Sequence, residues 1–319
     1  SLDTKDYELM IFLKKAKQNI LKKGFEINKY RWAQAYTSSL INLASSYQIN
    51  QQLVEAIKLQ KISLDICKAQ YVDRNESNSD VWAKNYTQNL IKLASSYKDN
   101  QQHSEAIKLE KESLEILKPL YKYNQDVWVE TYTANLSNLA VSYFYILQFS
   151  DAITLQRECL DILKGLYEGD SNQFQENYST CLNNLATSYK QNKQLAEAIE
   201  LEEESHRIRK KAYRYNPKLW ERAYISSSLN LACSYTQNQQ FSEAIKLGEE
   251  SLVIIKDLYK RNEAIWNKLY TDTLSRLASS YRGNQQFSEA IKLEEESLRV
   301  CKKMFNENKT LWVTVYTDG

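Results

Sequence analysis

The chain lacks the charge imbalance and the long apolar runs that mark several classes of protein. It has 42 basic and 40 acidic residues and a net charge of +2, whereas domains that bind nucleic acid are usually strongly basic or carry one basic face. No apolar run approaches the roughly 18 residues of a membrane span. The run from Met10 to Leu13 is too short for the apolar region of a signal peptide. We therefore expect a cytoplasmic protein that binds neither nucleic acid nor a membrane.

Residues that hold metals or carry out nucleophilic catalysis are also scarce. The five cysteines lie far apart and form no Cys-x-x-Cys pair, which argues against a disulfide framework and favours a reducing compartment. Both histidines, His103 and His206, stand where equivalent positions of the chain carry Leu or Phe, so we interpret them as packing residues. No P-loop, dinucleotide-binding or zinc-protease motif occurs. We expect no enzymatic activity, no metal and no cofactor.

What the chain does contain is one stretch that recurs six times. Counted from its first aromatic residue, each copy has Tyr at +4, Leu at +11, Ala at +12 and Tyr at +15. Spacings of mostly three and four predict one apolar face of an α-helix. The copies start at Trp32, Trp82, Trp128, Phe174, Trp220 and Trp266, and Trp312 starts a further one. The interval is 46 residues, except that the first is 50, with the extra residues in a polar stretch between Tyr71 and Asn78.

A second apolar stripe follows in each copy, with Ala at +24, Leu at +27 and Tyr or Phe at +39. A polar turn such as Asn238-Gln-Gln240 separates the two stripes. Residues that favour helix N-termini precede every copy by four positions: Asn28, Asn78, Asn124, Asp170, Asn216, Asn262 and Asn308. Each copy is therefore predicted to be a helix of about 19 residues, a turn and a second helix. The alanines at +12 and +24, present in all six copies, indicate that helices approach one another closely there.

This pattern resembles the tetratricopeptide repeat, in which Leu-Ala-x-x-Tyr, here Leu277 to Tyr281, is followed by a turn and then by Ala290. The usual unit has about 34 residues, and the longer units here are similar to those of kinesin light chain and of bacterial signalling and defence proteins. The family's usual glycine after the Leu is Ala278 here, and its proline late in the second helix is missing unless Pro119 serves in one copy. The resemblance covers nearly the whole chain and implies a fold more specifically than a function.

Together, the stripes and the resemblance predict an all-α fold, a right-handed α-solenoid of stacked antiparallel helix pairs. Residues 1–319 are expected to form one solenoid with units 28–77, 78–123, 124–169, 170–215, 216–261 and 262–307. Residues 3–27 then form an unpaired second helix and residues 308–319 a truncated first helix. We expect the chain to be part of a longer protein whose exposed terminal helices allow self-association.

The resemblance also implies that the first helices line a concave groove, at offsets +6, +9, +13, +16 and +17. The residues expected to contact a partner there are Ser38, Ile41, Ser45, Gln88, Ile91, Ser95, Ser137, Phe144, Tyr145, Thr180, Asn183, Thr187, Lys190, Asp272, Ser275, Ser279 and Arg282. This lining is small and polar, which suits hydrogen bonding to a peptide. Alternatively, short side chains there only permit tight curvature. The cluster of Lys, Asn and Arg with which related co-chaperones bind a terminal carboxylate is absent.

Three copies depart from the pattern. The third has Phe144, Tyr145, Ile146 and Leu147 where other copies are mostly polar, which indicates either a contact surface or local repacking. The fourth carries a basic run over residues 206–211, which is either a solvated helix face or a site for an acidic partner. The fifth copy has Ser228 at +8 and Leu229 at +9, whereas every other copy has Leu at +8.

A non-catalytic scaffold that binds a peptide or a partner domain in its groove is the leading functional hypothesis. One alternative is the sensor or regulatory arm of a larger signalling or defence enzyme, such as a nucleotide-hydrolysing switch or a caspase-like protease. A purely structural spacer is a third hypothesis.

Overall fold

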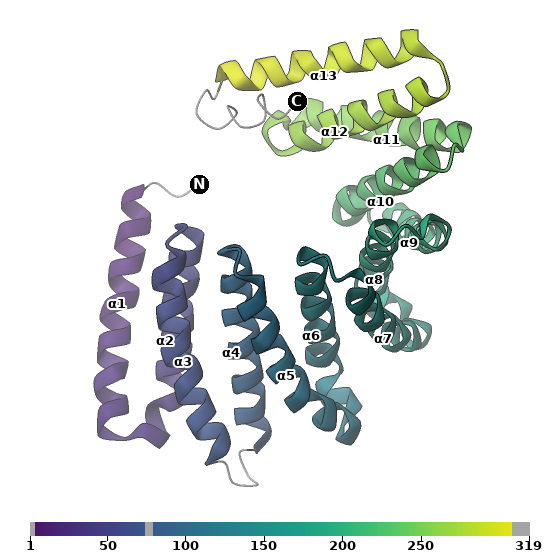
Figure 1. Ribbon diagram of the computed structural model, residues 1–319. Helices are drawn as coiled ribbons and strands as arrows, with labels where there is room; N and C mark the ends of the chain where they lie inside the picture. The colour runs from purple at the N-terminus through teal and green to yellow at the C-terminus, as the bar shows by residue number, and fades with distance from the viewer. Residues whose placement is uncertain (1–3, 74–78, 308–319) are drawn as a thin grey trace. The chain divides into compact units, whose positions relative to one another are not determined.

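A computed structural model describes residues 4–73 and 79–307, and helices are the only regular elements in these two ranges (Figure 1). The helices are α1 (Thr4–Ile27), α2 (Lys29–Ile49), α3 (Leu53–Val72), α4 (Ser79–Asp99), α5 (His103–Tyr123), α6 (Gln125–Tyr145), α7 (Phe149–Gly169), α8 (Ser171–Gln191), α9 (Leu195–Tyr215), α10 (Pro217–Gln237), α11 (Phe241–Arg261), α12 (Glu263–Gly283) and α13 (Phe287–Glu307). The predicted cap Asn78 and the predicted truncated helix at 308–319 lie outside the described residues.

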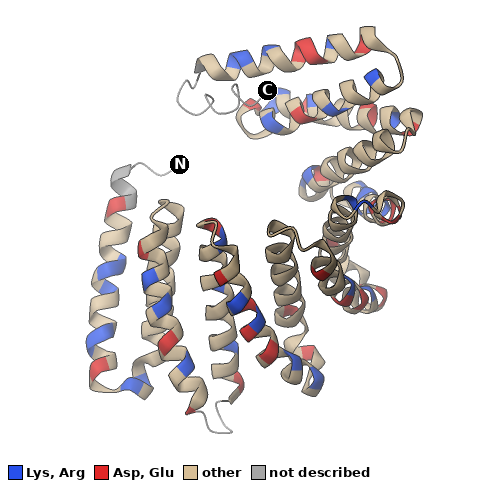
Figure 2. Cartoon of the chain, in the orientation of Figure 1, with Lys and Arg blue, Asp and Glu red and all other residues tan. Residues whose placement is uncertain are grey.

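The chain divides into two compact units, residues 1–159 and 160–319, with the boundary inside α7. In the first unit, α1 to α6 lie side by side in sequence order, and each packs on the next (Figure 1). In the second unit, α8 to α13 pack on one another in the same consecutive way. Each helix is thus held mainly by its neighbours in sequence, as the α-solenoid prediction requires. Basic and acidic residues are interleaved along most helices (Figure 2).

The predicted caps start the first helices of the pairs. The Oδ1 atom of Asn28 accepts a hydrogen bond of 3.0 Å from the backbone N–H of Arg31, which satisfies a group that the helix leaves without a partner. Four other caps, Asn124, Asp170, Asn216 and Asn262, accept backbone N–H groups in the same manner. The first helices are 21 residues long, slightly more than expected.

A left-handed residue that is not glycine stands in the turn inside each pair. In the fifth pair Gln239 has φ of 61°, its N–H donates to the Thr236 carbonyl at 3.1 Å, and the N–H of Gln240 donates to the Tyr235 carbonyl at 2.8 Å. This is the Schellman arrangement, which ends a helix and satisfies its last carbonyls. The equivalent residues with positive φ are Gln51, Gln101, Leu147, Lys193 and Gln285.

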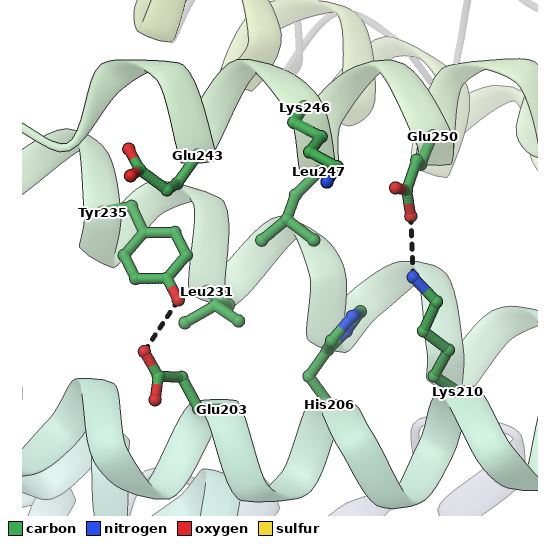
Figure 3. A pocket seen from close by; sticks show the side chains of 9 residues that line it. All are labelled: Glu203, His206, Lys210, Leu231, Tyr235, Glu243, Lys246, Leu247 and Glu250. Carbon is green, nitrogen blue, oxygen red and sulfur yellow. Dashed lines mark hydrogen bonds and ion pairs between the residues drawn. The ribbon is translucent and has the colours of Figure 1, made fainter.

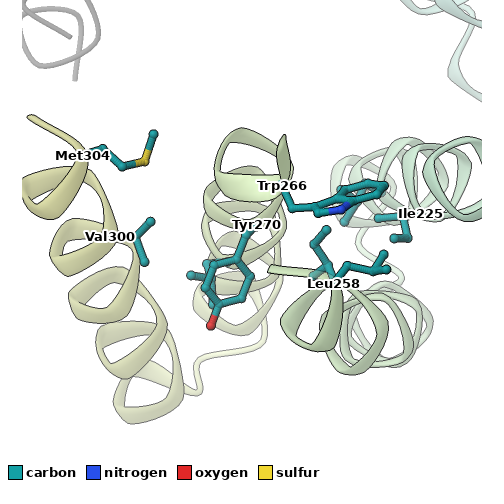
Figure 4. Close-up of a cluster of buried hydrophobic side chains, with 9 residues drawn as sticks. Ile225, Leu258, Trp266, Tyr270, Val300 and Met304 are labelled. Atoms are coloured by element: carbon teal, nitrogen blue, oxygen red, sulfur yellow. The ribbon is translucent and has the colours of Figure 1, made fainter. Parts of the chain in front are cut away.

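The core is continuous from one pair to the next. In the second unit one cluster joins Ile225 of α10, Leu258 of α11, Tyr270 of α12 and Met304 of α13 (Figure 4). Tyr259, at the end of one pair, stacks on Tyr270, at the start of the next, with ring centroids 4.6 Å apart. The same stack recurs between Tyr71 and Tyr86, Tyr121 and Tyr132, Tyr167 and Tyr178, and Tyr213 and Tyr224. The alanines at +12 and +24 are all at most 3% exposed, so they lie where helices approach most closely.

A polar contact accompanies each stack. The hydroxyl of Tyr224 donates to the carboxylate of Glu250 within the fifth pair, and Lys210 of the preceding pair binds the same carboxylate at 2.9 Å. Lysines of preceding pairs also reach Glu112, from Lys68, and Glu296, from Lys256. Most of these groups are partly exposed, so each ion pair contributes little stability by itself, but the repeated contact fixes how successive pairs are aligned.

The left-handed turn residues predict a stabilising substitution. Gln239→Gly should raise the free energy of unfolding by about 0.5–1 kcal/mol, because glycine has no Cβ to strain a positive φ. The control is Gln237→Gly, two residues earlier, where the backbone is helical and the same change should be destabilising. Urea denaturation of both variants checks this expectation, and two changes of the same sign would contradict it.

Candidate functional site

The two sides of the helix pairs differ in how closely successive helices approach. In the second unit the first helices α10 and α12 contact each other, and in the first unit α4 contacts α6. In the second unit α9 and α11 do not pack as closely, and open cavities separate them. There the first helices α10 and α12 lie on the more crowded side of the pairs, and the second helices α9 and α11 lie on the splayed side.

The predicted groove residues fall into three groups by exposure. The exposed ones are Ser38, Ser45, Ser95, Tyr145, Thr180, Asp272, Ser275, Ser279 and Arg282. Those of intermediate exposure are Gln88, Ile91, Ser137, Phe144, Thr187 and Lys190. Ile41 and Asn183 are buried, with 6% and 9% exposure. The last two side chains offer a partner almost no surface, so the +9 positions of the first and fourth copies belong to the core.

Asn183 and Lys190 both hold α8 against α9. The Asn183 amide donates to Ser205 Oγ at 2.7 Å and to the Ser179 carbonyl at 3.1 Å. The ammonium of Lys190 lies 2.6 Å from a carboxylate oxygen of Glu202, which is 1% exposed. A buried carboxylate needs such a partner, so Lys190 serves the helix pair rather than the surface.

The ion pair at Lys190 has a signal in the sequence that the groove prediction missed. Lys98 and Glu110 form the same pair in the second copy at 2.9 Å, and Arg282 and Glu294 form it in the sixth at 3.2 Å. The first, third and fifth copies carry uncharged residues at both of these positions, +16 and +28. A charge at one position thus accompanies an opposite charge at the other, which is the pattern expected of residues in contact.

The apolar stretch of the third copy is largely repacked. The ring of Phe144 lies edge-on to Phe149 with centroids 5.4 Å apart, and Tyr145 stacks on His103 at 4.9 Å. Tyr145 and Leu147 nevertheless remain 60% and 73% exposed. Figure 2 shows how few charged residues α6 carries beside them. Local repacking is therefore confirmed for Phe144 and for the Tyr145 ring, and the contact surface stays a prediction for the exposed Tyr145 and Leu147.

The basic run of the fourth copy is not a simple solvated face. His206 and Arg209 are only 8% and 9% exposed, and Arg209 occupies a position that is apolar in other copies. Its guanidinium donates to Ser179 Oγ, Thr180 Oγ1 and the Ala223 carbonyl, which joins α8, α9 and α10. Burial lowers the pKa of Arg209 from its ordinary value. The expectation of a solvated face is wrong for these two residues because they point into the contact between helix pairs.

His206 lines a cavity of about 280 Å³ between α9, α10 and α11 (Figure 3). Its ring stacks on Tyr224, and its Nδ1 lies 3.3 Å from Ser228 Oγ. Ser228 already donates its proton to the Tyr224 carbonyl, so we assign the imidazole proton to Nδ1 and leave Nε2 as a hydrogen-bond acceptor. Other copies have Leu at both positions, so the Ser228 departure of the fifth copy is matched to His206.

Charged groups lie at both ends of this cavity. Lys210 and Glu250 bind each other at one end, and their hydrogen bond raises the pKa of the lysine and lowers that of the carboxyl. At the other end the hydroxyl of Tyr235 donates to Glu203 at 2.7 Å (Figure 3). The cavity can therefore accept a small donor group at His206, between the Lys210–Glu250 ion pair at one end and the Tyr235–Glu203 hydrogen bond at the other.

The described residues do not meet the requirements of a membrane span, a metal site or a disulfide. None of their helices combines the length and apolar character that crossing a membrane requires. No group of three His, Cys, Asp or Glu side chains in the same residues is placed to hold a metal ion. The five cysteines, which all lie in the described residues, form no disulfide, and Cys67, Cys159 and Cys181 are buried.

The burial of His206 predicts a pH-dependent stability. Desolvation lowers the pKa of His206 from 6.5 to about 4, although Glu250 nearby opposes the shift. Between these values the unfolded chain binds a proton that the folded chain does not, so this contribution is complete above about pH 6.5 and is lost as the pH falls toward 4. The maximal loss is roughly 3 kcal/mol.

The variant His206→Leu/Ser228→Leu, which restores the residues of other copies, should lose this part of the pH dependence. Thermal melting of both proteins from pH 7 to pH 4 measures the difference. Parallel curves for the two proteins would contradict the assignment. The double change is preferred because a single His206→Leu substitution leaves Ser228 Oγ without its second contact.

Comparisons with known proteins agree with the fold of repeated helix pairs. Models of the tetratricopeptide repeat match residues 131–211, 225–262 and 271–308. No curated protein matches the chain.

Several solved structures have a similar fold. BtubC (BKLC) from P. vanneervenii is 18% identical with a TM-score of 0.63, covering 79% of this chain and 92% of that one. A putative kinesin light chain from Podosopora anserina with nearly identical TPR-like repeats is 24% identical with a TM-score of 0.56, covering 69% and 96%. Aspartyl phosphate phosphatase F from Bacillus subtilis is 12% identical with a TM-score of 0.55, covering 86% and 73%. At these identities the likeness is one of fold alone.

Proposed function

Because this chain is a tetratricopeptide repeat protein, we propose that it is a non-catalytic scaffold that binds a peptide or a partner domain along its first helices. The observation that supports this most directly is that, in each unit, small hydroxyl side chains are exposed on the first helices. Ser38, Ser45, Ser95, Ser275 and Ser279 are all exposed there. Such a surface lets a polypeptide backbone approach closely and offers it hydrogen-bonding groups.

The charge of this surface supports a neutral backbone ligand. Lys98, Lys190 and Arg282 all face carboxylates of their own pair, so their charges are already compensated. Asp272 is likewise paired with Arg276 at 3.4 Å. Hydrogen bonding to an extended or helical peptide therefore accounts for this surface better than attraction to a highly charged ligand.

The free cysteines support a reducing, cytoplasmic location for this scaffold. An expression test with a fluorescent fusion of the full chain would place it, and secretion with formation of disulfides would argue against the proposal.

A bulky residue on the first-helix face should abolish binding. Ser275→Trp fills the proposed contact surface, and we expect it to weaken capture of the partner by about tenfold or more. The control is Ser288→Trp, the same change at an exposed position of the second helix α13. Binding is measured by calorimetry with a partner isolated by affinity capture, with helicity checked by circular dichroism. Equal binding by both variants would exclude the first helices as the site. Asn183 is unsuitable for this test because it is buried.

Self-association through a terminal helix is a further part of the proposal. On α1 an apolar stripe of Leu9, Phe12, Leu13 and Ile20 is 57–71% exposed. Exposed apolar stripes of this kind commonly mark contacts. Sedimentation should show concentration-dependent association that Phe12→Glu/Ile20→Glu abolishes and that Val72→Glu, on α3 with 68% exposure, leaves intact. A monomeric parent protein at high concentration would rule the contact out.

A further inference from the structure

The cavity at His206 is one end of a longer groove between the second helices α9 and α11. A second cavity of about 360 Å³ shares Lys210 and Glu250 with it, and a third of about 610 Å³ shares Tyr213, Val253 and Ile254 with the second. The three cavities follow α11 from Glu243 to Arg261, nearly its full length. We refer to them together as the α9–α11 groove. It lies on the splayed side of the pairs, away from the first-helix face.

The middle of the α9–α11 groove exposes an apolar side chain that the repeat pattern does not require. Val253 is 74% exposed and lines the second and third cavities. The equivalent position, +33, is charged in every other copy: Asp65, Glu115, Asp161, Arg207 and Arg299. Ile254 and Tyr213 lie beside Val253 in the groove, and Tyr215 at its far end is 82% exposed. This apolar floor leaves surface in water that a bound partner would cover.

The rims of the α9–α11 groove differ in charge. On the α11 side Glu250 is paired with Lys210, and Asp257 with Arg261. On the other side a stripe of basic residues follows α9 and the start of α10 at intervals of four, three and four: Arg207, Lys211, Arg214 and Lys218. Of these, Arg214 lines the second cavity and Lys218 the third. All four are exposed, and none forms an ion pair with another described residue. The acidic Glu221 of α10 also lines the third cavity, and Glu203 and Glu243 line the first cavity together with Lys246, so the unpaired cations beside the apolar floor are Arg214 and Lys218.

We propose that the α9–α11 groove binds an acidic amphipathic segment of a partner protein. The apolar side chains of the segment cover Val253, Ile254 and Tyr213, and its carboxylates face the basic stripe on α9. Complementary charge selects the occupant along the second and third cavities, because the α11 carboxylates that line them, Glu250 and Asp257, are paired with cations, whereas Arg214 and Lys218 are paired with no carboxylate of the described residues. A donor side chain of the segment can reach Nε2 of His206 at the end of the groove. This site is separate from the first-helix face, so it does not depend on the function proposed there.

A peptide selection tests this proposal even though the partner is unidentified. The probe is a random library of peptides of about 20 residues, the length of a helix that matches α11. The library is displayed on phage and selected on the full chain after depletion on the Val253→Glu variant. Val253 is exposed and three other copies carry an acidic residue there, so this variant should fold normally. We expect the enriched peptides to combine Asp and Glu with apolar residues at helical spacing.

Fluorescence anisotropy with the most enriched peptide then measures the contribution of each part of the groove. Val253→Glu should weaken binding by about tenfold or more, because it removes an apolar contact and adds a charge of the same sign as the peptide. Arg214→Glu/Lys218→Glu, at the two basic residues that line the cavities, should weaken it to a similar extent and reduce its dependence on salt. The matched control is Arg299→Glu, at the same position in the next copy. This variant should bind the peptide with the affinity of the parent protein. Ser275→Trp on the first-helix face should also bind normally.

Several outcomes would overturn the proposal. The first is that every selected peptide also binds the Val253→Glu variant. The second is that the enriched peptides are basic or uncharged. The third is that a peptide binds the parent protein and both groove variants with equal affinity. Binding to vesicles of phosphatidylcholine and phosphatidylserine that Val253→Glu abolishes would assign the groove to an anionic membrane surface instead. Dimerisation of the parent protein that the same substitution abolishes would assign it to a second copy of the chain.

Discussion

Close contact between helices that carry small side chains is the constraint on which this structure depends. Ala44 and Ala56 in the first pair, and their equivalents in the other five, are almost fully buried. At the +31 position Ser63, Ser113, Cys159, Ser205 and Ser251 are fully buried as well. These short residues bring the backbones together, and the large Tyr, Trp and Leu side chains beside them can then fill the space between successive pairs. A longer side chain at any of these places would separate the helices and disrupt the aromatic stack next to it.

The same packing divides the surface into two kinds of site. The first helices α10 and α12 approach one another, and exposed side chains on α12 such as Ser275 and Ser279 are short and polar. The second helices α9 and α11 diverge, so they leave a groove that long side chains such as Tyr213 and Lys210 only partly fill. The differences among copies matter most in this groove, because a substitution there changes its floor or its charge without disturbing the contacts that stack the pairs.

Departures from the repeat are explained by pairs of residues rather than by single positions. His206 and Ser228 come from consecutive copies, and together they replace two leucines by a hydrogen bond. Lys190 and Glu202 likewise replace two uncharged residues. Considered alone, Ser228 is only a departure from the repeat, and Lys190 is a predicted groove residue. Considered with its partner, each is a local solution to burying polar atoms with their hydrogen bonds made.

The amino-acid sequence alone determined the helices, their caps, their turns and their order, because these features depend on residues close together in the chain. The spacing of Tyr270, Leu274 and Leu277 defines a helix face, and Asn262 ends the preceding segment, whatever surrounds them. Only the tertiary structure decided which side chains of different helices meet. Asn183 fitted the groove pattern yet lies buried against Ser205. Val253 is part of the groove only because α9 forms its other wall. Helical periodicity places a residue on a face of its own helix, but exposure and partnership depend on how the neighbouring helices pack against that face.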